Sequence, residues 1–396
     1  MLSSGKGSMR WLFVGTLIVH GLFHLLGFAQ SLGWLRIERL TQPISHVLGF
    51  GWLLGALLLW AAAVAFALDA RWFWLIGTAA VVLSQVLIGS AWSDARFGTL
   101  MNGIALLGVL LGFASRGPAS FRAAYEGQVH AQLGTPSEPH VVSEADLAPL
   151  PEPVQQYLRL TGSVGRPQVS SFRATWQGRI RGSADEPWMV FRAEQHNFYA
   201  AGATRLFLMN ATLKGLPVDV FHRFVGESAS FGVRLLSIYP LVDAKGPDLD
   251  RAETVTLFND LCVLAPSRLI DPAIQWETMG ARTVRARYTR GRETIGALLE
   301  FNELGELVDF TSDDRLRASA DGKSFIRQRW TTPLRSYRSF GARRVASIGE
   351  ARWDDPSGAF AYGEFELLDL EYAIGIATPP SPVPERGRGR IATESP

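Results

Sequence analysis

Cysteine is the scarcest residue of this chain, because Cys262 is the only one among 396 residues. A single cysteine forms no intrachain disulfide, and it cannot supply the thiolate cluster of a zinc or iron–sulfur site. Cys262 falls on the apolar side of a predicted helix. We therefore expect a small buried hydrophobic residue with little of the thiolate that a nucleophile requires.

Motifs of the common enzyme classes are also missing. No glycine-rich phosphate loop precedes a predicted helix, and the HExxH, GxSxG and protein kinase signatures are absent. The 39 basic residues are scattered among 37 acidic ones, unlike the clustered positive charge of a nucleic-acid-binding surface. We expect no metal, no cofactor and no nucleic-acid partner. The sequence leaves open whether the protein is an enzyme.

Charged residues almost vanish between Trp11 and Ala114, where four apolar runs follow one another. Each run is close to the roughly 20 residues that cross a bilayer core, and tryptophans gather near the ends of the runs, as they do at membrane interfaces. The runs are Trp11–Gln30, Val47–Leu68, Trp72–Trp92 and Phe97–Ala114. Residues 1–116 are therefore predicted to form a bundle of four transmembrane helices, with membrane lipids as their partners.

The basic residues of the short loops predict the orientation of this bundle, because they concentrate on the cytoplasmic side. If the N-terminus lies inside, the inner loops carry more of them than the outer loops. The inner set is Lys6, Arg10, Arg71, Arg116 and Arg122, and the outer set is Arg36, Arg39 and Arg96. This bias predicts a multi-pass protein of the bacterial inner membrane with its soluble domain in the cytoplasm.

Four histidine and amide side chains stand out among the polar residues inside the predicted spans. His20 and His24 are four residues apart and share one face of the first helix, and Gln85 and Asn102 lie in the third and fourth. Polar groups at membrane depth face the bundle interior, where they pair or form a site. We interpret them as a seam of interhelical hydrogen bonds. The alternative is a histidine pair that binds metal or haem or relays protons.

The remainder of the chain is polar. Residues 117–143 are predicted to be a polar linker, since Gly134, Pro136 and Pro139 interrupt any regular element, and residues 378–396 a disordered tail. Between them, residues 144–377 carry two short helical turns and many strand patterns. The predicted strands are 172–180, 205–213, 218–225, 283–290, 293–301, 307–311, 324–331 and 358–372.

The stretch Asp250–Asp271 is the one long helical pattern in this region. Its apolar residues recur at helical spacing, Asp250 and Glu253 have the spacing of a capping box, and Pro266 ends the pattern. A lone helix beside many hairpin-spaced strands predicts an α+β domain, in which a curved antiparallel sheet packs on one long central helix.

Such a sheet either packs fully on its helix or leaves an apolar cavity for a ligand. The candidates for lining a cavity are Phe207, Met209, Phe221, Phe258, Leu261 and Cys262. His222 is a candidate general base if Asp260 or Glu227 lies beside it. Arg327 and Arg329, on one face of a predicted strand, are candidates for contact with anionic headgroups.

Several segments together resemble a family of uncharacterised bacterial membrane proteins in which a domain of unknown function follows an N-terminal membrane region. They are HGLFHLLGF (20–28), AWSDARFGTLMN (91–102), LFNDLCVLAPSRLID (257–271) and FNELGELVDFTSDDR (301–315). The resemblance implies no activity. The architecture is also similar to the open-barrel folds of lipoprotein carriers and periplasmic lipid-binding proteins, which implies a location outside the inner membrane and conflicts with the cytoplasmic orientation.

From these patterns we predict a membrane-anchored binding module for a lipid or another apolar small molecule. One alternative is a membrane-bound enzyme of unknown reaction, acting around His222 and Asp260 or in the seam at His20 and His24. The other is a structural or signalling membrane protein. A large apolar cavity favours the first reading, and convergent polar groups with perturbed pKa values in a cleft favour the enzyme.

Overall fold

The structure is a computed structural model that describes residues 4–35, 41–134, 140–200, 202–319, 324–356 and 358–373. The predicted tail, residues 378–396, lies outside the described residues, as do Arg36 and Arg39 of the orientation argument. The predicted fold class is confirmed, because four apolar N-terminal helices are followed by a large domain built on an open, curved antiparallel sheet.

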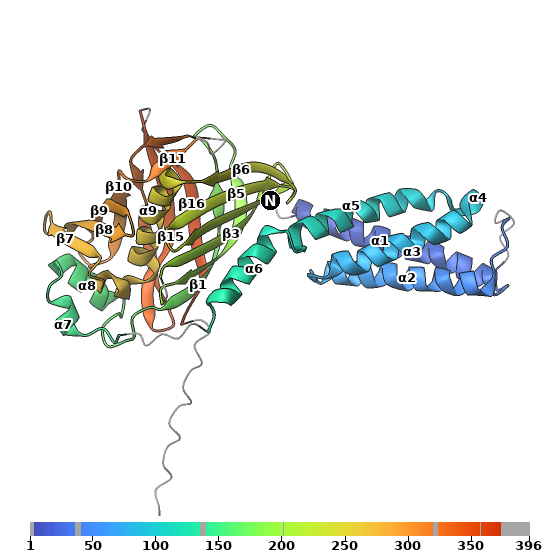
Figure 1. The fold of residues 1–396 in the computed structure, drawn as a ribbon, viewed down its shortest axis with the longest axis horizontal. Coiled ribbons are helices and arrows are strands. Elements are labelled where there is room, and N and C mark those ends of the chain that lie inside the picture. Colours follow the sequence, from blue (N-terminus) through green and yellow to red (C-terminus); the bar gives the residue numbers. More distant parts are fainter. Residues whose placement is uncertain are drawn as a thin grey trace, which may run out of the picture.

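The four apolar helices form an elongated bundle (Figure 1). They are α1 (Ser4–Ser31), α2 (His46–Ala67), α3 (Phe73–Ser90) and α5 (Gly98–Arg116), with the short helix α4 (Trp92–Ala95) between the last two. By length and composition, four helices of the described residues are apolar enough to cross a membrane. They correspond to the four predicted runs.

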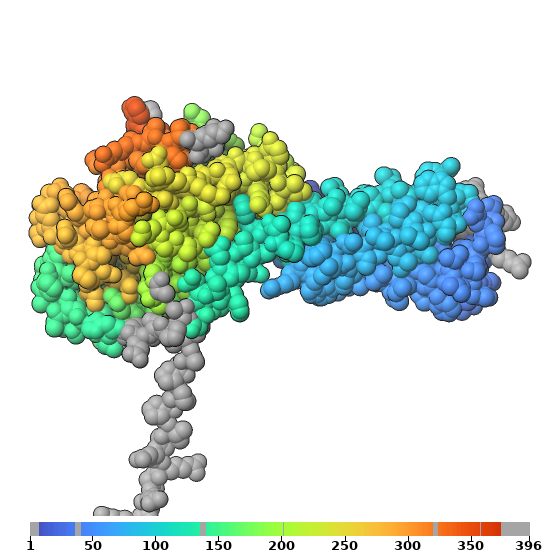
Figure 2. Space-filling model, in the orientation of Figure 1, coloured from blue at the N-terminus to red at the C-terminus, as the bar shows by residue number. Residues whose placement is uncertain are grey.

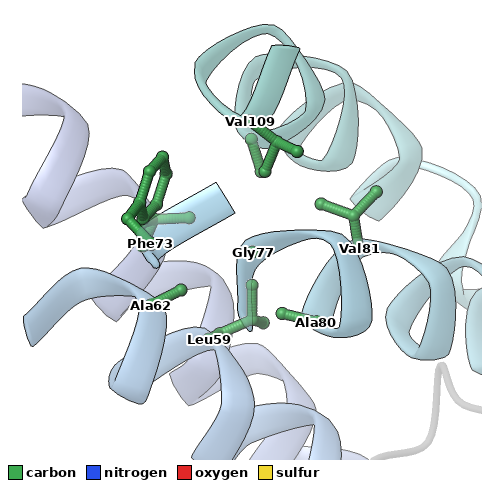
Figure 3. Close-up of a pocket in the computed structure, with 9 residues that line it drawn as sticks. Leu59, Ala62, Phe73, Gly77, Ala80, Val81 and Val109 are labelled. Carbon is green, nitrogen blue, oxygen red and sulfur yellow. The ribbon is translucent and has the colours of Figure 1, made fainter. Parts of the chain in front are cut away.

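Small residues allow these helices to approach closely. Ala62, Gly77, Ala80 and Ala105 lie at the centre of the bundle, where Gly77 meets Val109. A narrow apolar gap remains at this point (Figure 3), but it is too small to hold a water molecule. We therefore interpret the gap as a packing imperfection between helices and not as a ligand site.

The predicted linker contains a helix that the sequence analysis did not anticipate, α6 (Phe121–Gln132). Ser120 caps it by accepting a hydrogen bond from the amide of Ala123 at 3.1 Å. Phe121, Tyr125 and Val129 recur every fourth residue, so they form one apolar face, which packs on the sheet. The breakers Gly134, Pro136 and Pro139 all lie beyond this helix.

The sheet domain begins with two short helices, α7 (Glu144–Leu147) and α8 (Glu152–Leu160). In the described residues the main sheet has the strand order β6-β5-β4-β3-β2-β1-β16-β15-β13-β10-β9-β8-β7, with β14 added on β15 and antiparallel pairing throughout. Its first six strands are β1 (Ser171–Ile180), β2 (Met189–Phe198), β3 (Thr204–Leu213), β4 (Leu216–Val225), β5 (Ser228–Leu235) and β6 (Tyr239–Lys245).

The other strands follow the central helix in the chain. They are β7 (Ile274–Thr278), β8 (Thr283–Arg290), β9 (Glu293–Phe301), β10 (Leu307–Ser312), β13 (Trp330–Thr331), β14 (Leu334–Phe340), β15 (Arg343–Asp355) and β16 (Gly358–Tyr372). A separate two-stranded sheet pairs β11 (Leu316–Ala318) with β12 (Phe325–Arg327). The predicted strand 324–331 is therefore wrong as a single element, because the chain leaves the small sheet after Arg327 and joins the main sheet at Trp330.

The central helix, α9 (Pro247–Leu264), lies within the curve of the sheet, and the short 3-10 helix η1 (Pro266–Ile270) follows it. Phe258 stacks on Tyr288 with ring centroids 4.9 Å apart and packs against Phe310. The last carbonyls of a helix lack partners within it. Here Tyr157 donates to the carbonyl of Cys262, and Tyr372 donates to that of Leu264, both at 2.8 Å.

The predicted capping box at Asp250 and Glu253 is wrong. The helix begins three residues earlier, where Pro247 follows Gly246, whose φ of 115° suits glycine. Asp250 accepts a hydrogen bond from the amide of Ala229 at 2.6 Å, on the edge of β5. Glu253 is buried in the interior of the domain, where it has other partners.

The position of Cys262 can be tested by its reactivity. Burial raises the pKa of this thiol well above its ordinary value, so little thiolate exists at neutral pH. We expect the native chain to react slowly with a soluble thiol reagent and to react completely after denaturation. A Leu304→Cys variant, altered at an exposed turn, should label rapidly and serves as the control. Rapid labelling of native Cys262 would contradict the placement of α9.

Candidate functional site

Five charged or titratable side chains meet inside the sheet domain, and we call them the charged cluster. Glu253 and Asp260 come from α9, Arg205 from β3, His222 from β4, and Arg315 from the segment between β10 and β11. Glu253 and Asp260 are only 1% and 8% exposed. Charges buried this deeply require partners, because their removal from water costs several kcal/mol per ion.

Asp260 is held by three donors on the sheet. The Arg205 Nε and the Gln195 Nε2 each donate to its Oδ2 at 2.7 Å, and Asn197 donates to the same oxygen at 3.2 Å. Burial raises the pKa of Asp260, while the ion pair with Arg205 and these hydrogen bonds oppose the rise. This half of the charged cluster is a tightly bonded anchor between α9 and strands β2 and β3.

Glu253 is held more loosely. Its Oε1 lies 3.3 Å from His222 Nε2 and 3.4 Å from Arg315 Nη2, and its Oε2 lies 3.8 Å from Arg205 Nη1. Among the described residues, Oε1 has no hydrogen-bond partner. A buried carboxylate oxygen without a hydrogen bond is costly. This half of the charged cluster therefore keeps unused capacity to accept a hydrogen bond.

Burial has opposite consequences for the two members of the His222–Glu253 pair. It lowers the pKa of His222 to about 4, although Glu253 acts in the other direction. Burial alone would raise the pKa of Glu253, but His222, Arg315 and Arg205 together outweigh it and lower that pKa. At neutral pH the pair is therefore an uncharged imidazole beside an ionised carboxylate.

An apolar strip adjoins the charged cluster on the concave face of the sheet. Its buried members come from β2, β3 and β4, and partly buried residues, among them Val220 and Leu235, extend it. The buried members are Phe191, Ala193, Phe207, Met209, Ala211 and Val218. In the described part of the chain, no residue of α9 belongs to this strip.

The apolar strip and the charged cluster are continuous. Phe207 stands opposite His222 in the pairing of β3 with β4, and the Arg205 guanidinium lies 5.1 Å from the centre of the Phe207 ring. On β2 the strip residue Ala193 is two positions from Gln195, which also accepts a hydrogen bond from Trp176 at 3.1 Å. The strand alternation thus aligns apolar residues and cluster residues along one face.

The six predicted cavity residues do not lie together. Phe258, Leu261 and Cys262 belong to the main core around α9, and Phe207 and Met209 belong to the apolar strip. Phe221 lies on the opposite face of the sheet, where its ring packs against Phe121 and Tyr125 of α6. The alternation along β4 that separates Phe221 from Val218 and Val220 is visible in the sequence, but the pairing of β4 with β3 and the helix that covers Phe221 were not predicted.

The predicted general base has a different partner from those proposed. His222 lies beside Glu253, while Asp260 is bound by Arg205, and Glu227 lies in the turn after β4 near Gly291. Sequence reasoning missed Glu253 and Arg315 as members of a site. The feature that marks them appears only in the structure, where four polar residues of α9, Glu253, Thr254, Thr256 and Asp260, are all buried.

The four polar residues of the bundle lie close together. His20 Nε2 is 2.9 Å from Asn102 Oδ1 and 3.2 Å from Ser84 Oγ, and Asn102 donates to Gln85 at 3.0 Å. His24 is bonded to the carbonyl of His20 at 3.1 Å. In the part of the chain that the structure describes, no group of three or more His, Cys, Asp or Glu side chains is placed to hold a metal ion.

The two predicted headgroup contacts are paired with acids. Arg327 lies 2.9 Å from Asp314, and Arg329 lies 2.9 Å from Asp313. They are not on one strand face, because β12 ends at Arg327 and β13 begins at Trp330. Exposed pairs of this kind partly neutralise the charge that would attract an anionic surface.

The fold and the site define a class of protein: an apolar four-helix bundle joined to an open antiparallel sheet that encloses one buried helix. The chain belongs to the family of unknown function DUF6544, whose model matches residues 140–365. The match covers the sheet domain up to the middle of β16 and begins after the bundle. The suspected membership in an uncharacterised family is thereby confirmed.

Several solved structures match the chain, including the following two. A putative outer membrane lipoprotein-sorting protein domain from Vibrio parahaemolyticus is 10% identical, with a TM-score of 0.32, over 52% of this chain and 87% of that one. A DUF1329 family protein from Desulfovibrio piger is 11% identical, with a TM-score of 0.33, over 60% and 96%. With TM-scores below 0.5, these likenesses carry no argument about function. No curated protein matched the sequence.

The charged cluster predicts how stability depends on pH. In the unfolded chain His222 takes up a proton near its ordinary pKa of 6.5, but in the folded chain only near 4. The unfolded state therefore binds more protons between these values, and the folded state is destabilised as pH falls from 6.5 towards 4. His196, whose pKa burial also lowers to about 4, acts in the same direction.

Between pH 7 and pH 5, each of these histidines should lower the free energy of unfolding by about 2 kcal/mol. Thermal unfolding of the His222→Gln variant should therefore lack about 2 kcal/mol of the destabilisation that the wild type shows between pH 7 and pH 5. The control, His140→Gln, removes an exposed histidine outside the core and should keep that dependence. An unchanged dependence in His222→Gln would contradict a buried neutral His222.

Proposed function

We propose that the protein is a membrane-anchored binding module that holds a lipid or another apolar molecule along the apolar strip. The observation that carries this proposal is the strip itself. Its centre is buried, but its partly buried members, among them Val220, Val233 and Leu235, keep apolar surface on the concave face of the open sheet, and the strip includes no residue of α9. Contiguous apolar surface that remains partly open to water is typical of a binding site.

The apolar strip and the charged cluster together favour an elongated ligand with one polar end. An acyl chain lying along the partly buried residues Val220, Val233 and Leu235 would remove apolar surface from water, at about 25 cal/mol per Å². Its polar end would then lie near Glu253, whose Oε1 keeps capacity to accept a hydrogen bond. A hydroxyl or amide donor at that end fits this oxygen better than a carboxylate.

The bundle supplies the anchor in this proposal. Its four apolar helices would cross the bacterial inner membrane, and the excess of basic residues on the N-terminal side would hold both termini in the cytoplasm. Arg10 and Arg116 lie at this end of the bundle, where they bond to the carbonyl of Ala67 and to Asp69. The chain is then divided into three parts: the four membrane helices, a linker that contains α6, and the sheet domain.

An enzyme remains the second candidate, and the His222–Glu253 pair is the observation that favours it. A neutral buried imidazole beside a carboxylate is suited to general base catalysis. The two readings differ in a testable way. If the protein is an enzyme, His222→Gln should abolish turnover and leave ligand binding intact, because His222 lies beside the apolar strip and not within it.

Ligand binding can be tested on the full chain purified from membranes. Native mass spectrometry should show an apolar adduct that survives the collisional activation that strips lipids from the bundle. Val220→Glu places a carboxylate on the apolar strip and should remove the adduct. Val225→Glu places the same charge on the same strand but on the face covered by α6, so it should retain the adduct. Identical adducts in all three proteins would contradict the proposal.

The orientation has its own test. Alkaline phosphatase is active only after export, so its fusion to the C-terminus of the full chain should be inactive. A green fluorescent protein fused at the same position should fluoresce in the cytoplasm. An active phosphatase fusion would reverse the orientation and place the apolar strip outside the inner membrane.

A further inference from the structure

We infer that the hairpin tips at one end of the sheet form a docking surface for the bilayer that the bundle spans. The inference deepens the proposed function and rests on its membrane anchor. Two tips make up this surface, which we call the docking tips: the β3–β4 turn with Leu216, and the β5–β6 turn with Ile238 and Tyr239. They lie side by side, since the amide of Leu236 donates to the carbonyl of Pro217 at 2.8 Å.

The docking tips expose large apolar side chains. Leu216, Ile238 and Tyr239 are 47%, 58% and 64% exposed. Single exposed apolar residues are ordinary on protein surfaces, but here they gather at the ends of two adjacent hairpins, and Lys214 lies in the first turn. Aliphatic and tyrosine side chains next to a lysine suit the interface of a bilayer with anionic headgroups.

The β5–β6 turn places two residues other than glycine in a strained backbone conformation. Leu236 and Ser237 both have positive φ, 55° and 62°, and the amide of Ile238 donates to the carbonyl of Leu235. A turn of this shape normally uses asparagine and glycine, since other side chains crowd the backbone there. Such strain persists where the surrounding structure enforces it and clusters at functional sites. Ser237 is fixed by a hydrogen bond to Asp219 on β4.

The same end of the sheet lies next to the end of the bundle. Arg234, the residue before the last one of β5, donates to the carbonyl of Ala119 at 3.0 Å, and its guanidinium lies 4.0 Å from the centre of the Phe121 ring. Ala119 is three residues beyond Arg116, where α5 ends. Figure 1 shows β5 and β6 reaching towards the bundle, while β7, β8 and α8 lie on the far side, and Figure 2 shows the two regions in contact through the chain around α6.

This placement also locates the entrance of the apolar strip. Leu213 and Leu235 are the last residues of β3 and β5, and both belong to the strip. With the docking tips in the headgroup region, an acyl chain could pass from the leaflet onto the strip without crossing water. The strip would then draw its ligand from the same membrane that holds the bundle.

The test uses the full chain in vesicles of phosphatidylethanolamine and phosphatidylglycerol. An environment-sensitive fluorophore is attached to Ile238→Cys and, as the matched control, to Leu304→Cys, which is 71% exposed in the turn after β9. Wild type, whose only thiol is Cys262, gives the background. Both labels sit on one domain, so the orientation of the protein in the vesicle affects them equally.

At residue 238 we expect a blue-shifted emission that doxyl-labelled lipids quench and iodide does not. At residue 304 we expect quenching by iodide alone. Equal iodide quenching at both positions, in protein that remains embedded in the vesicles, would overturn the docking surface. A label at residue 238 that neither quencher reaches would also overturn it, because a protein partner would then cover the tip.

These outcomes are separable from those of the proposed function. Failure of the membrane anchor would appear as protein that does not incorporate into the vesicles at all. Failure of ligand binding would appear as equal adducts in the mass spectrometry of the Val220→Glu and Val225→Glu variants. Neither result alters the quenching expected at residue 238 in embedded protein. The quenching measurement therefore tests the docking surface independently.

Discussion

The burial of two carboxylates on one helix is the constraint on which the sheet domain depends. Glu253 and Asp260 lie seven residues apart, two turns along the same side of α9, and both are buried. Each needs cations from outside the helix. Arg205 comes from β3 and Arg315 from the segment after β10, strands that lie in opposite halves of the sheet order. The sheet must therefore curve until both halves reach α9.

The same constraint explains why α9 carries polar residues and is yet largely buried from Ala252 to Leu264. A helix that faces water on one side needs no partners there, whereas the polar side of α9 contacts charged side chains of the sheet. Removing one partner of such a pair leaves a buried charge and typically costs 3–5 kcal/mol. The buried cations need stabilising contacts as well. The Arg315 guanidinium has two of them, because it lies 5.2 Å from the centre of the Trp330 ring and 5.9 Å from that of Trp353.

Much of the architecture could be predicted because its signals are local. Apolar runs of about 20 residues indicate the bundle helices, and the alternation from Phe172 to Ile180 indicates β1. Phe207 and Leu208 face opposite ways on β3, and the burial of both faces follows from that pattern. The local pattern could not predict which element covers each face of β3. Helix α6 covers one face, and α9 with the charged cluster covers part of the other.

The site was harder to predict because its members are distant in the chain. His222, Glu253 and Arg315 are brought together only by the order of the strands, and no spacing between them is characteristic of a motif. A capping box is a local rule, and it assigned Glu253 to the start of α9, where the structure places Pro247 instead. The capping-box rule failed because the Glu253 carboxylate pairs with His222 and Arg315, which are distant in the sequence.

Helix α6 has a further consequence for the affinity that the proposed binding of an apolar ligand requires. It follows α5 after four residues and is joined to the sheet by Arg122–Glu194 at 3.0 Å and by Tyr125–His196 at 2.6 Å. If the bundle spans a membrane as proposed, a domain held in this way stays at a fixed height above that membrane and moves only parallel to it. Confinement of this kind raises the effective concentration of any membrane-dissolved ligand to the millimolar range typical of short tethers. Under the proposed function, weak intrinsic affinity with rapid exchange would then be sufficient to keep the ligand on the apolar strip.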